Sequence, residues 1–321
     1  MNTPDRPVIR LKSDRPPGHP WVWSAQVVKP ETRLAPGSVV RVEDAKGRFV
    51  AQAFWNGHAR IALRLLDTHS QAVIDADWIT RRIDRAVALR REWLALERET
   101  DACRLVHSEG DDLSGLIVDR YADVLVIEYF AAGMWKFRDA IHAALKRHFP
   151  AATLYWFAEN HVQKQESFDC TSPAPPAPFL VHEHGLSFHA APGRGHKTGF
   201  FADQRANRRR FAELARGRNV LDLCCNAGGF AVHALAAGAR AATGVDMDAG
   251  ILDIARLNAA ANHVEATFEQ ADIFDWLRAA TARGERWDAV VLDPAKLTRD
   301  RQRVTDALKK YFAMNRLALD V

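Results

Sequence analysis

Four acidic residues stand at or just after the ends of four short apolar segments in the C-terminal part of the chain. They are Asp222, Asp246, Asp272 and Asp293. A glycine pair, Gly228-Gly229, follows the first of them, between Asn226 and Phe230. Glycines at such a place let the backbone approach a ligand closely and present free N–H groups at a helix start. Carboxylates accept hydrogen bonds from ribose hydroxyls and attract positive charge. The pattern predicts a site for a small ligand that carries both.

The spacing of these residues discriminates between two nucleotide cofactors. A dinucleotide site favours G-x-G-x-x-G, with the pyrophosphate at the helix N-terminus. Here the glycines are adjacent, the first G-x-G is missing, and four carboxylates would repel a pyrophosphate. S-adenosylmethionine, a cationic cofactor, fits better. We expect Asp246 to accept from its ribose hydroxyls and Asp272 from its adenine amino group. The alternative is that Asp222 and Asp272 only cap helices.

Alternating strands and helices must position these residues. The strands expected are 220–223, 241–246, 265–270 and 289–292, and the helices are 229–237, 249–261, 273–283 and 305–317. Such alternation predicts an α/β fold with a doubly wound parallel sheet. Ligands of these sheets lie outside the carboxyl ends of the strands, where all four acids fall.

The preceding residues predict two further domains. Strands at 39–42, 49–51 and 61–65, with a turn signal at 44–47, indicate a small β-barrel over residues 1–78. An amphipathic helix over 78–98 connects it to a small α+β domain, and the two together cover 79–190. The strands and helix expected in that domain are 116–118, 124–127, 154–157 and 134–148. A proline-rich linker at 172–178 comes before the doubly wound domain, 191–321.

A basic segment leads into the doubly wound domain. Between Pro192 and Arg218, eight basic residues stand against two acids, a local charge of +6 against +4 for the whole chain. Residues 203–216 predict a helix with Phe211 and Leu214 inward and its arginines outward. Such a face can neutralise RNA phosphates, although an ordinary solvated helix is the alternative. The residues expected to contact RNA are Lys197, Arg205, Arg208 and Arg209. Phe201, ahead of the first strand, is expected to touch the cofactor.

Composition and cysteine usage exclude several classes of protein. The chain is 48% hydrophobic and 26% charged, which excludes collagen-like and disordered proteins. No apolar run reaches the ~18 residues of a membrane span. The cysteines, which show no zinc spacing, are Cys103, Cys170, Cys224 and Cys225. We therefore expect a cytoplasmic protein with no metal site and no membrane partner.

Three motifs resemble one family of enzymes. Residues 18–23 (GHPWVW) resemble the start of a PUA domain, an RNA-binding β-barrel, and residues 109–121 (EGDDLSGLIVDRY) resemble the signature of a central domain. Residues 196–205 (HKTGFFADQR) resemble the segment that leads into the catalytic domain. In these motifs the chain is similar to class I S-adenosylmethionine-dependent methyltransferases of large-subunit ribosomal RNA, which act on carbon 5 of cytosine.

This resemblance implies a Rossmann-like class I methyltransferase domain preceded by a PUA-like barrel and a small α+β domain. It also implies that Asp222 and Gly228 lie at the methionine end of S-adenosylmethionine, Asp246 at its ribose and Asp272 at its adenine. The implied partner is large-subunit ribosomal RNA. A homodimer is the assembly that we keep open.

The chain departs from this family in two places. Methylation of cytosine carbon 5 requires a thiolate that adds at carbon 6. Cys224 and Cys225 are expected to pack rather than attack, so a nucleophilic Cys is expected beyond residue 321. The fourth strand ends in Asp293-Pro294-Ala295-Lys296-Leu297, where the family has Asp-Pro-Pro, one residue and Phe. We expect Asp293 and Pro294 to face the target base.

The number of strands also bears on the extent of the catalytic domain. A complete sheet of this class has seven strands and four are predicted here, so the domain is expected to be incomplete at its C-terminal side. Our interpretation is an RNA methyltransferase with cytosine carbon 5 as its target. Two alternatives stay open: transfer to another RNA atom, and a noncatalytic RNA-binding protein if the chain ends at residue 321.

Overall fold

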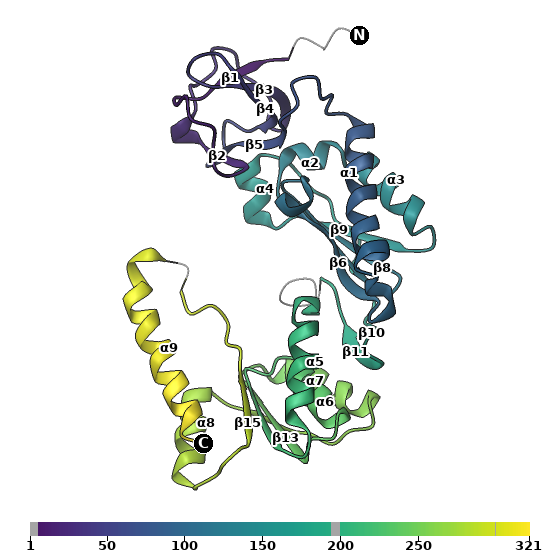
Figure 1. Cartoon of the computed structure of the whole chain (residues 1–321), viewed down its shortest axis with the longest axis vertical. Helices are drawn as coiled ribbons and strands as arrows, with labels where there is room; N and C mark the ends of the chain where they lie inside the picture. The colour runs from purple at the N-terminus through teal and green to yellow at the C-terminus, as the bar shows by residue number, and fades with distance from the viewer. Residues whose placement is uncertain (1–5, 194–199, 299) are drawn as a thin grey trace. The chain divides into compact units, whose positions relative to one another are not determined.

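Figure 1 shows the computed structural model of the chain, which describes residues 6–193, 200–298 and 300–321. Its contacts divide the chain into two compact units. The first contains Met1–Ala177 and Ala191–Gly199, and the second contains Pro178–Ala190 and Phe200–Val321. Within the three described ranges, no helix is both long enough and apolar enough to cross a membrane.

The first unit opens with a five-stranded sheet in the order β1-β3-β4-β5-β2. Its strands are β1 (Val8–Arg10), β2 (Trp21–Trp23), β3 (Ser38–Glu43), β4 (Phe49–Trp55) and β5 (Ile61–Asp67). β4 pairs antiparallel with β3 and β5, and its last five residues are all buried. The Asp44 side chain accepts the backbone N–H groups of Lys46 and Arg48 at 2.8 and 3.0 Å, which closes the predicted β3–β4 turn.

A second sheet of this unit has the order β6-β7-β8-β9. Its elements are β6 (Ala102–His107), β7 (Leu116–Tyr121), β8 (Val124–Tyr129) and β9 (Thr153–Phe157), with α1 (Ala76–Ala88), α2 (Ala132–Lys136), α3 (Arg138–His148) and α4 (Asn160–Glu166). The helix predicted over 78–98 leaves α-helical geometry after Ala88, passes through a π-helical turn, and is broken at Ala95, whose φ is +49°. The helix predicted over 134–148 is two helices that meet at Phe137.

A buried ion pair ties the five-stranded sheet to the rest of the first unit. The Arg64 guanidinium of β5 donates to Glu166 Oε1 of α4 at 3.0 Å, and the two side chains are 8% and 4% exposed. Asn56 Nδ2 donates to the other carboxylate oxygen of Glu166 at 3.0 Å. Because Arg64 and Glu166 are 102 residues apart, their pairing joins the two predicted N-terminal domains.

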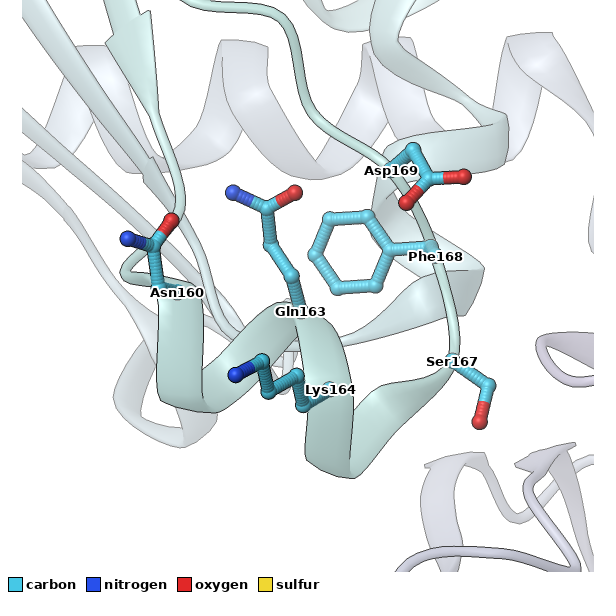
Figure 2. A pocket seen from close by; sticks show the side chains of 6 residues that line it. All are labelled: Asn160, Gln163, Lys164, Ser167, Phe168 and Asp169. Carbon is cyan, nitrogen blue, oxygen red and sulfur yellow. The ribbon is translucent and has the colours of Figure 1, made fainter.

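Figure 2 shows a pocket of about 450 Å³ beside α4. Its lining side chains are Asn160, Gln163, Lys164, Ser167, Phe168 and Asp169. Backbone groups already use the Gln163 amide, which donates to Ala158 O and accepts from Cys170 N, both at 2.8 Å. The pocket is therefore a recess beside a helix-to-loop turn, and its lining includes none of the predicted site residues.

The second unit is built on a parallel sheet in the order β14-β13-β12-β15. Its elements are β12 (Asn219–Leu223), β13 (Ala241–Asp246), β14 (Thr267–Gln270) and β15 (Ala289–Leu292), with α5 (Arg205–Ala215), α6 (Gly229–Ala236), α7 (Ala249–Ala261), α8 (Ile273–Ala282) and α9 (Val304–Leu319). The chain runs from β12 to β13 and β14 on one side, then crosses to β15 on the other. This order confirms the predicted doubly wound sheet.

The two faces of this sheet are covered by different helices. Leu221 and Val245 of the sheet share a core with Trp276 of α8 and Met314 of α9. Figure 1 shows α5, α6 and α7 on the other side. Both faces are thus buried, as the apolar runs of β12 and β13 require.

A hairpin of β10 (Phe179–Glu183) and β11 (Leu186–Ala190) also belongs to the second unit. It lies outside the parallel sheet, and β11 packs on α7. The predicted boundary lies after residue 190, whereas the contacts group the hairpin with the second unit. The reason is tertiary, because Glu183 and Phe188 are fully buried and contact Arg208 and His233, which follow residue 200.

Candidate active site

The four predicted acids occupy the carboxyl ends of the four parallel strands. Asp222 lies in β12 and Asp246 ends β13, whereas Asp293 directly follows β15 and Asp272 lies two residues after the end of β14. Burial, followed by the charges of all four carboxylates, raises the pKa of Cys224 to about 11. The four strands are parallel and adjacent in one sheet, so their carboxyl ends, with these four acids, lie at the same edge. The structure thus brings together residues that span 72 positions of the sequence.

Asp222 is the most deeply buried of these acids. The residue is 1% exposed, and its Oδ2 accepts the backbone N–H of Ala231 in α6 at 3.2 Å. Burial raises the pKa of Asp222 to about 7, and the charges of Asp246 and Asp293 act in the same direction. A carboxyl in this state ionises readily when a cation arrives beside it.

Asp246 connects two turns at the end of its strand. Its Oδ2 accepts the backbone N–H of Asn226 at 2.9 Å, and its Oδ1 accepts that of Asp248 at 3.1 Å. Asp248, which the sequence analysis did not single out, is the N-cap of α7 and accepts from Gly250 and Ile251. The Asp246 carboxylate therefore holds the loop after β12 beside the start of α7.

Asp272 is the N-cap of α8. Its Oδ1 accepts the backbone N–H groups of Phe274 and Asp275 at 2.8 and 3.4 Å. The capping alternative therefore describes Asp272 correctly, and the contact of Asp222 with Ala231 in the first turn of α6 is of the same kind. Capping does not separate these acids from the site, because both stay at the carboxyl ends of parallel strands of the same sheet.

The loop after β12, residues 224–230, has an unusual backbone. Cys224, Asn226 and Gly228 have φ values of +57°, +50° and +73°. At Gly228 a side chain is excluded, because a Cβ would lie 2.8 Å from the Phe268 ring of β14. α6 begins at Gly229, and Phe230 packs edge-on against Phe211 of α5 with ring centroids 5.9 Å apart. The loop therefore presents backbone close to the four acids.

The cysteines beside this loop are poor nucleophiles as they stand. Cys225 is 5% exposed, and burial raises the pKa of its thiol. Cys224 is half-buried, with its pKa raised to about 11. Both thiols are protonated at neutral pH, and the expected packing of Cys225 is confirmed.

Asp293 is held by the segment that leads into α5. Gln204 Nε2 donates to Asp293 Oδ2 at 2.8 Å, and Gln204 Oε1 accepts from Asn207 Nδ2 at 2.6 Å. Asp293 itself is exposed, and Pro294 beside it is half-buried. Gln204 was not among the predicted site residues, although predicted RNA contacts flank it in the sequence. An exposed carboxylate with a fixed orientation can accept a hydrogen bond from a ligand.

The basic helix differs from its prediction in the residues that it buries. Arg208, Ala212 and Ala215 face inward, whereas Leu214 is 50% exposed. Arg208 is 4% exposed and donates to both carboxylate oxygens of Glu183 at 2.7 Å. Its guanidinium is committed to a buried carboxylate, which argues against the expected contact with RNA. The partner lies on the hairpin, which no motif had indicated.

The other predicted RNA contacts have different positions. Arg205 is half-buried at the start of α5, and Arg209 is exposed on it. Lys197 lies outside the described residues. Phe201 is half-buried, and its carbonyl accepts from the Arg208 guanidinium at 3.0 Å.

Comparisons with known proteins agree with this architecture. Residues 17–68 match a PUA-like domain, and residues 103–317 match the S-adenosylmethionine-dependent methyltransferase family. Ribosomal RNA large subunit methyltransferase I of Erwinia tasmaniensis is 34% identical over 94% of this chain and 78% of the relative. The protein of the same name from Shewanella amazonensis is 32% identical over 98% of this chain and 82% of the relative.

Solved structures show the same fold. SMU.776, a methyltransferase complexed with SAH, superposes with a TM-score of 0.79 at 24% identity, over 95% of this chain and 79% of that one. A methyltransferase from Streptococcus mutans superposes with a TM-score of 0.72 at 22% identity, over 90% and 77% of the two chains. The family match covers more than half of the chain, and the doubly wound sheet carries the four acids in the expected order. The chain belongs to the S-adenosylmethionine-dependent methyltransferase family and combines its catalytic fold with a PUA-like domain.

Proposed function

We propose that this chain transfers a methyl group from S-adenosylmethionine to a base of large-subunit ribosomal RNA, with carbon 5 of a cytosine as the target. The observation that carries the proposal is the placement of four carboxylates at the carboxyl ends of four adjacent parallel strands. Such a site suits a cationic cofactor with ribose hydroxyls. The choice of RNA is supported by the relatives, which are methyltransferases of large-subunit ribosomal RNA by name.

The residues present fit the cofactor in charge and in hydrogen-bonding chemistry. We assign Asp222 and Gly228 to its methionine end, because Asp222 is a buried carboxyl that a positive charge would ionise. We assign Asp246 to the ribose and Asp272 to the adenine. The remaining lining residues of this proposal are Asn226, Gly229, Phe230 and Phe201. When bound, the cofactor supplies an electrophilic methyl group.

The RNA side of the proposal rests on the opposite edge of the same site. We assign Asp293 and Pro294 to the target base, because Gln204 orients the Asp293 carboxylate and leaves the residue exposed. Lys197, Arg205 and Arg209 are assigned to phosphates. Arg208 is withdrawn from this group because it is buried against Glu183.

Methyl transfer to carbon 5 of cytosine requires a thiolate that adds at carbon 6. The raised pKa values of Cys224 and Cys225 argue against either of them in this role. Their place beside the four acids instead favours contact with the cofactor side of the site. The proposal therefore assigns the attacking thiolate to neither, and transfer to carbon 5 needs the nucleophilic Cys that is expected beyond residue 321.

The test is methyl transfer to undermodified ribosomal RNA. The protein is incubated with isotopically labelled S-adenosylmethionine and large-subunit RNA that lacks the modification, and the product nucleoside is identified by mass spectrometry. We expect labelled 5-methylcytidine, and no label with Asp222→Ala. Label in another nucleoside would support a methyltransferase of a different RNA atom. Binding of cofactor and RNA without transfer would favour the noncatalytic alternative.

A further inference from the structure

The β10–β11 hairpin is attached to α7 by two asparagines one helical turn apart. Asn262 accepts from Ser187 N at 2.8 Å and donates to Ser187 O at 2.7 Å. Asn258 accepts from His189 N at 2.8 Å. Ser187 and His189 lie two residues apart on one face of β11, and Asn258 and Asn262 lie one helical turn apart. The two amides therefore bond to the strand backbone as a neighbouring strand would.

The second side of the Asn258 amide reaches the loop of residues 224–230. Asn258 Nδ2 donates to Ala227 O at 2.9 Å, and the residue is 0% exposed. Asn262 Nδ2, by contrast, donates to Ser187 O and to Asn258 O. Asn258 therefore links the hairpin to the loop, whereas Asn262 links the hairpin to its own helix only.

The other strand of the hairpin reaches the far end of the same loop. Glu183 of β10 accepts from the Arg208 guanidinium. The Arg208 side chain packs against Gly229, where an added Cβ would lie 2.9 Å from Arg208 Cδ. Phe188 of β11 stacks on His233, with ring centroids 5.2 Å apart, and His233 Nδ1 lies 2.9 Å from Gly229 O. Because a carbonyl can only accept, His233 Nδ1 donates this bond. The hairpin thus contacts Asn258, which bonds to Ala227, and also Arg208 and His233, which contact Gly229.

The loop requires such support because its conformation is costly. Cys224 and Asn226 have φ values of +57° and +50°, a region that side chains disfavour. Residues held in that region keep it only where the surrounding structure determines it. The hydrogen bonds from Asn258 and His233 hold Ala227 and Gly229 of this loop in place.

We propose that the hairpin fixes the 224–230 loop in the conformation that binds the cofactor, with Asn258 as the positioning residue. This inference rests on the cofactor site proposed above. Asn258 acts through Ala227 and needs no contact of its own with the cofactor. Losing a buried hydrogen bond to the loop should lower cofactor affinity about tenfold.

The test compares Asn258→Ala with Asn262→Ala in the full chain. Both variants remove an amide that pairs with β11, buried in Asn258 and half-buried in Asn262, so both should lower the melting temperature. We expect the dissociation constant of S-adenosylhomocysteine, measured by calorimetry below the melting range, to rise about tenfold in Asn258→Ala and less than about twofold in Asn262→Ala. Equal changes in the two variants, or none in Asn258→Ala, would overturn the proposal. If the alanine variants do not fold, Asn258→Leu and Asn262→Leu, which fill the volume, take their place.

Hydrogen exchange in the cofactor-free protein separates this inference from the function on which it rests. We expect amides of residues 225–230 to exchange faster in Asn258→Ala than in the wild type, and at the wild-type rate in Asn262→Ala. Unchanged exchange in Asn258→Ala would overturn the coupling between hairpin and loop. A wild-type protein that binds no S-adenosylhomocysteine would instead overturn the proposed cofactor site, and the exchange comparison would still decide the coupling.

Discussion

Two buried ion pairs, one in each unit, have the same chemistry and different surroundings. Arg64–Glu166 joins β5 to α4 in the first unit, and Arg208–Glu183 joins α5 to β10 in the second. In each pair, both side chains are less than a tenth exposed. The partners of the first pair include a loop carbonyl, Phe130 O, whereas those of the second include Phe201 O beside the proposed cofactor site. Burial and ion pairing alone therefore do not identify a functional arginine. The other groups that the guanidinium contacts distinguish the two.

The largest expected effect is the loss of one partner from either pair. Arg64→Met and Arg208→Met each leave a buried glutamate unpaired, which should destabilise the unit concerned by about 3–5 kcal/mol. Only Arg208→Met should also weaken binding of S-adenosylhomocysteine, because only Arg208 packs against Gly229. Urea unfolding and calorimetry measure the two effects. Equal loss of affinity in both variants would show that general destabilisation, not position, is responsible.

Removal of both partners sharpens the comparison. Glu183→Leu with Arg208→Met should recover most of the stability lost in the single variant, since apolar replacements of a buried pair are often neutral or stabilising. Its cofactor affinity should stay low, because the packing against Gly229 and the bond to Phe201 O are still missing. Calorimetry at equal stability checks this, with Glu166→Leu plus Arg64→Met as the matched control. Recovery of affinity together with stability would contradict a positioning role.

A smaller effect concerns two carboxyls whose pKa values burial raises to about 7, Asp222 in the second unit and Glu128 in the first. Ionised Asp222 attracts positive charge, so affinity for S-adenosylhomocysteine, whose amino group is cationic, should rise about tenfold from pH 6 to pH 8. Because the pKa of Asp222 lies above that of an unfolded Asp, its own contribution to the stability of the fold falls as the pH rises toward this pKa. Calorimetry across this range should show the rise in the wild type and in Glu128→Gln. A rise that persists in Asp222→Asn would assign it to another group.

The smallest effect separates half-buried Arg205 and exposed Arg209 of α5 from buried Arg208. Arg205→Ala and Arg209→Ala should each reduce the slope of log affinity for ribosomal RNA against log salt by about 0.7–0.9, the value for one lost phosphate contact. Arg283→Ala is the control, because Arg283 lies on the turn after α8 and not on α5. Filter binding at several salt concentrations measures the slopes. An unchanged slope in both α5 variants would favour the solvated-helix alternative.

Regular elements of the catalytic domain were predictable from local pattern. The predicted 241–246 strand and 249–261 helix have the observed bounds, because apolar runs, Gly238 and the Asp248 cap mark their ends within the sequence itself. The hairpin was not predicted, although Gly185 between two short apolar-polar alternations is a turn signal that could have indicated it. The orientation of α5 was predicted wrongly because charge was taken to mean exposure.

By itself, the sequence determined the order of strands and helices and the placement of four acids at strand ends, because those features repeat with local periods of two and 3.6 residues. Only the tertiary structure decided which arginine is buried, which asparagine reaches the cofactor loop, and which unit contains the hairpin. Arg208 and Glu183 are 25 residues apart, and Asn258 and Ala227 are 31 apart. No local period encodes such a contact, so it exists only once the sheet has brought both segments together.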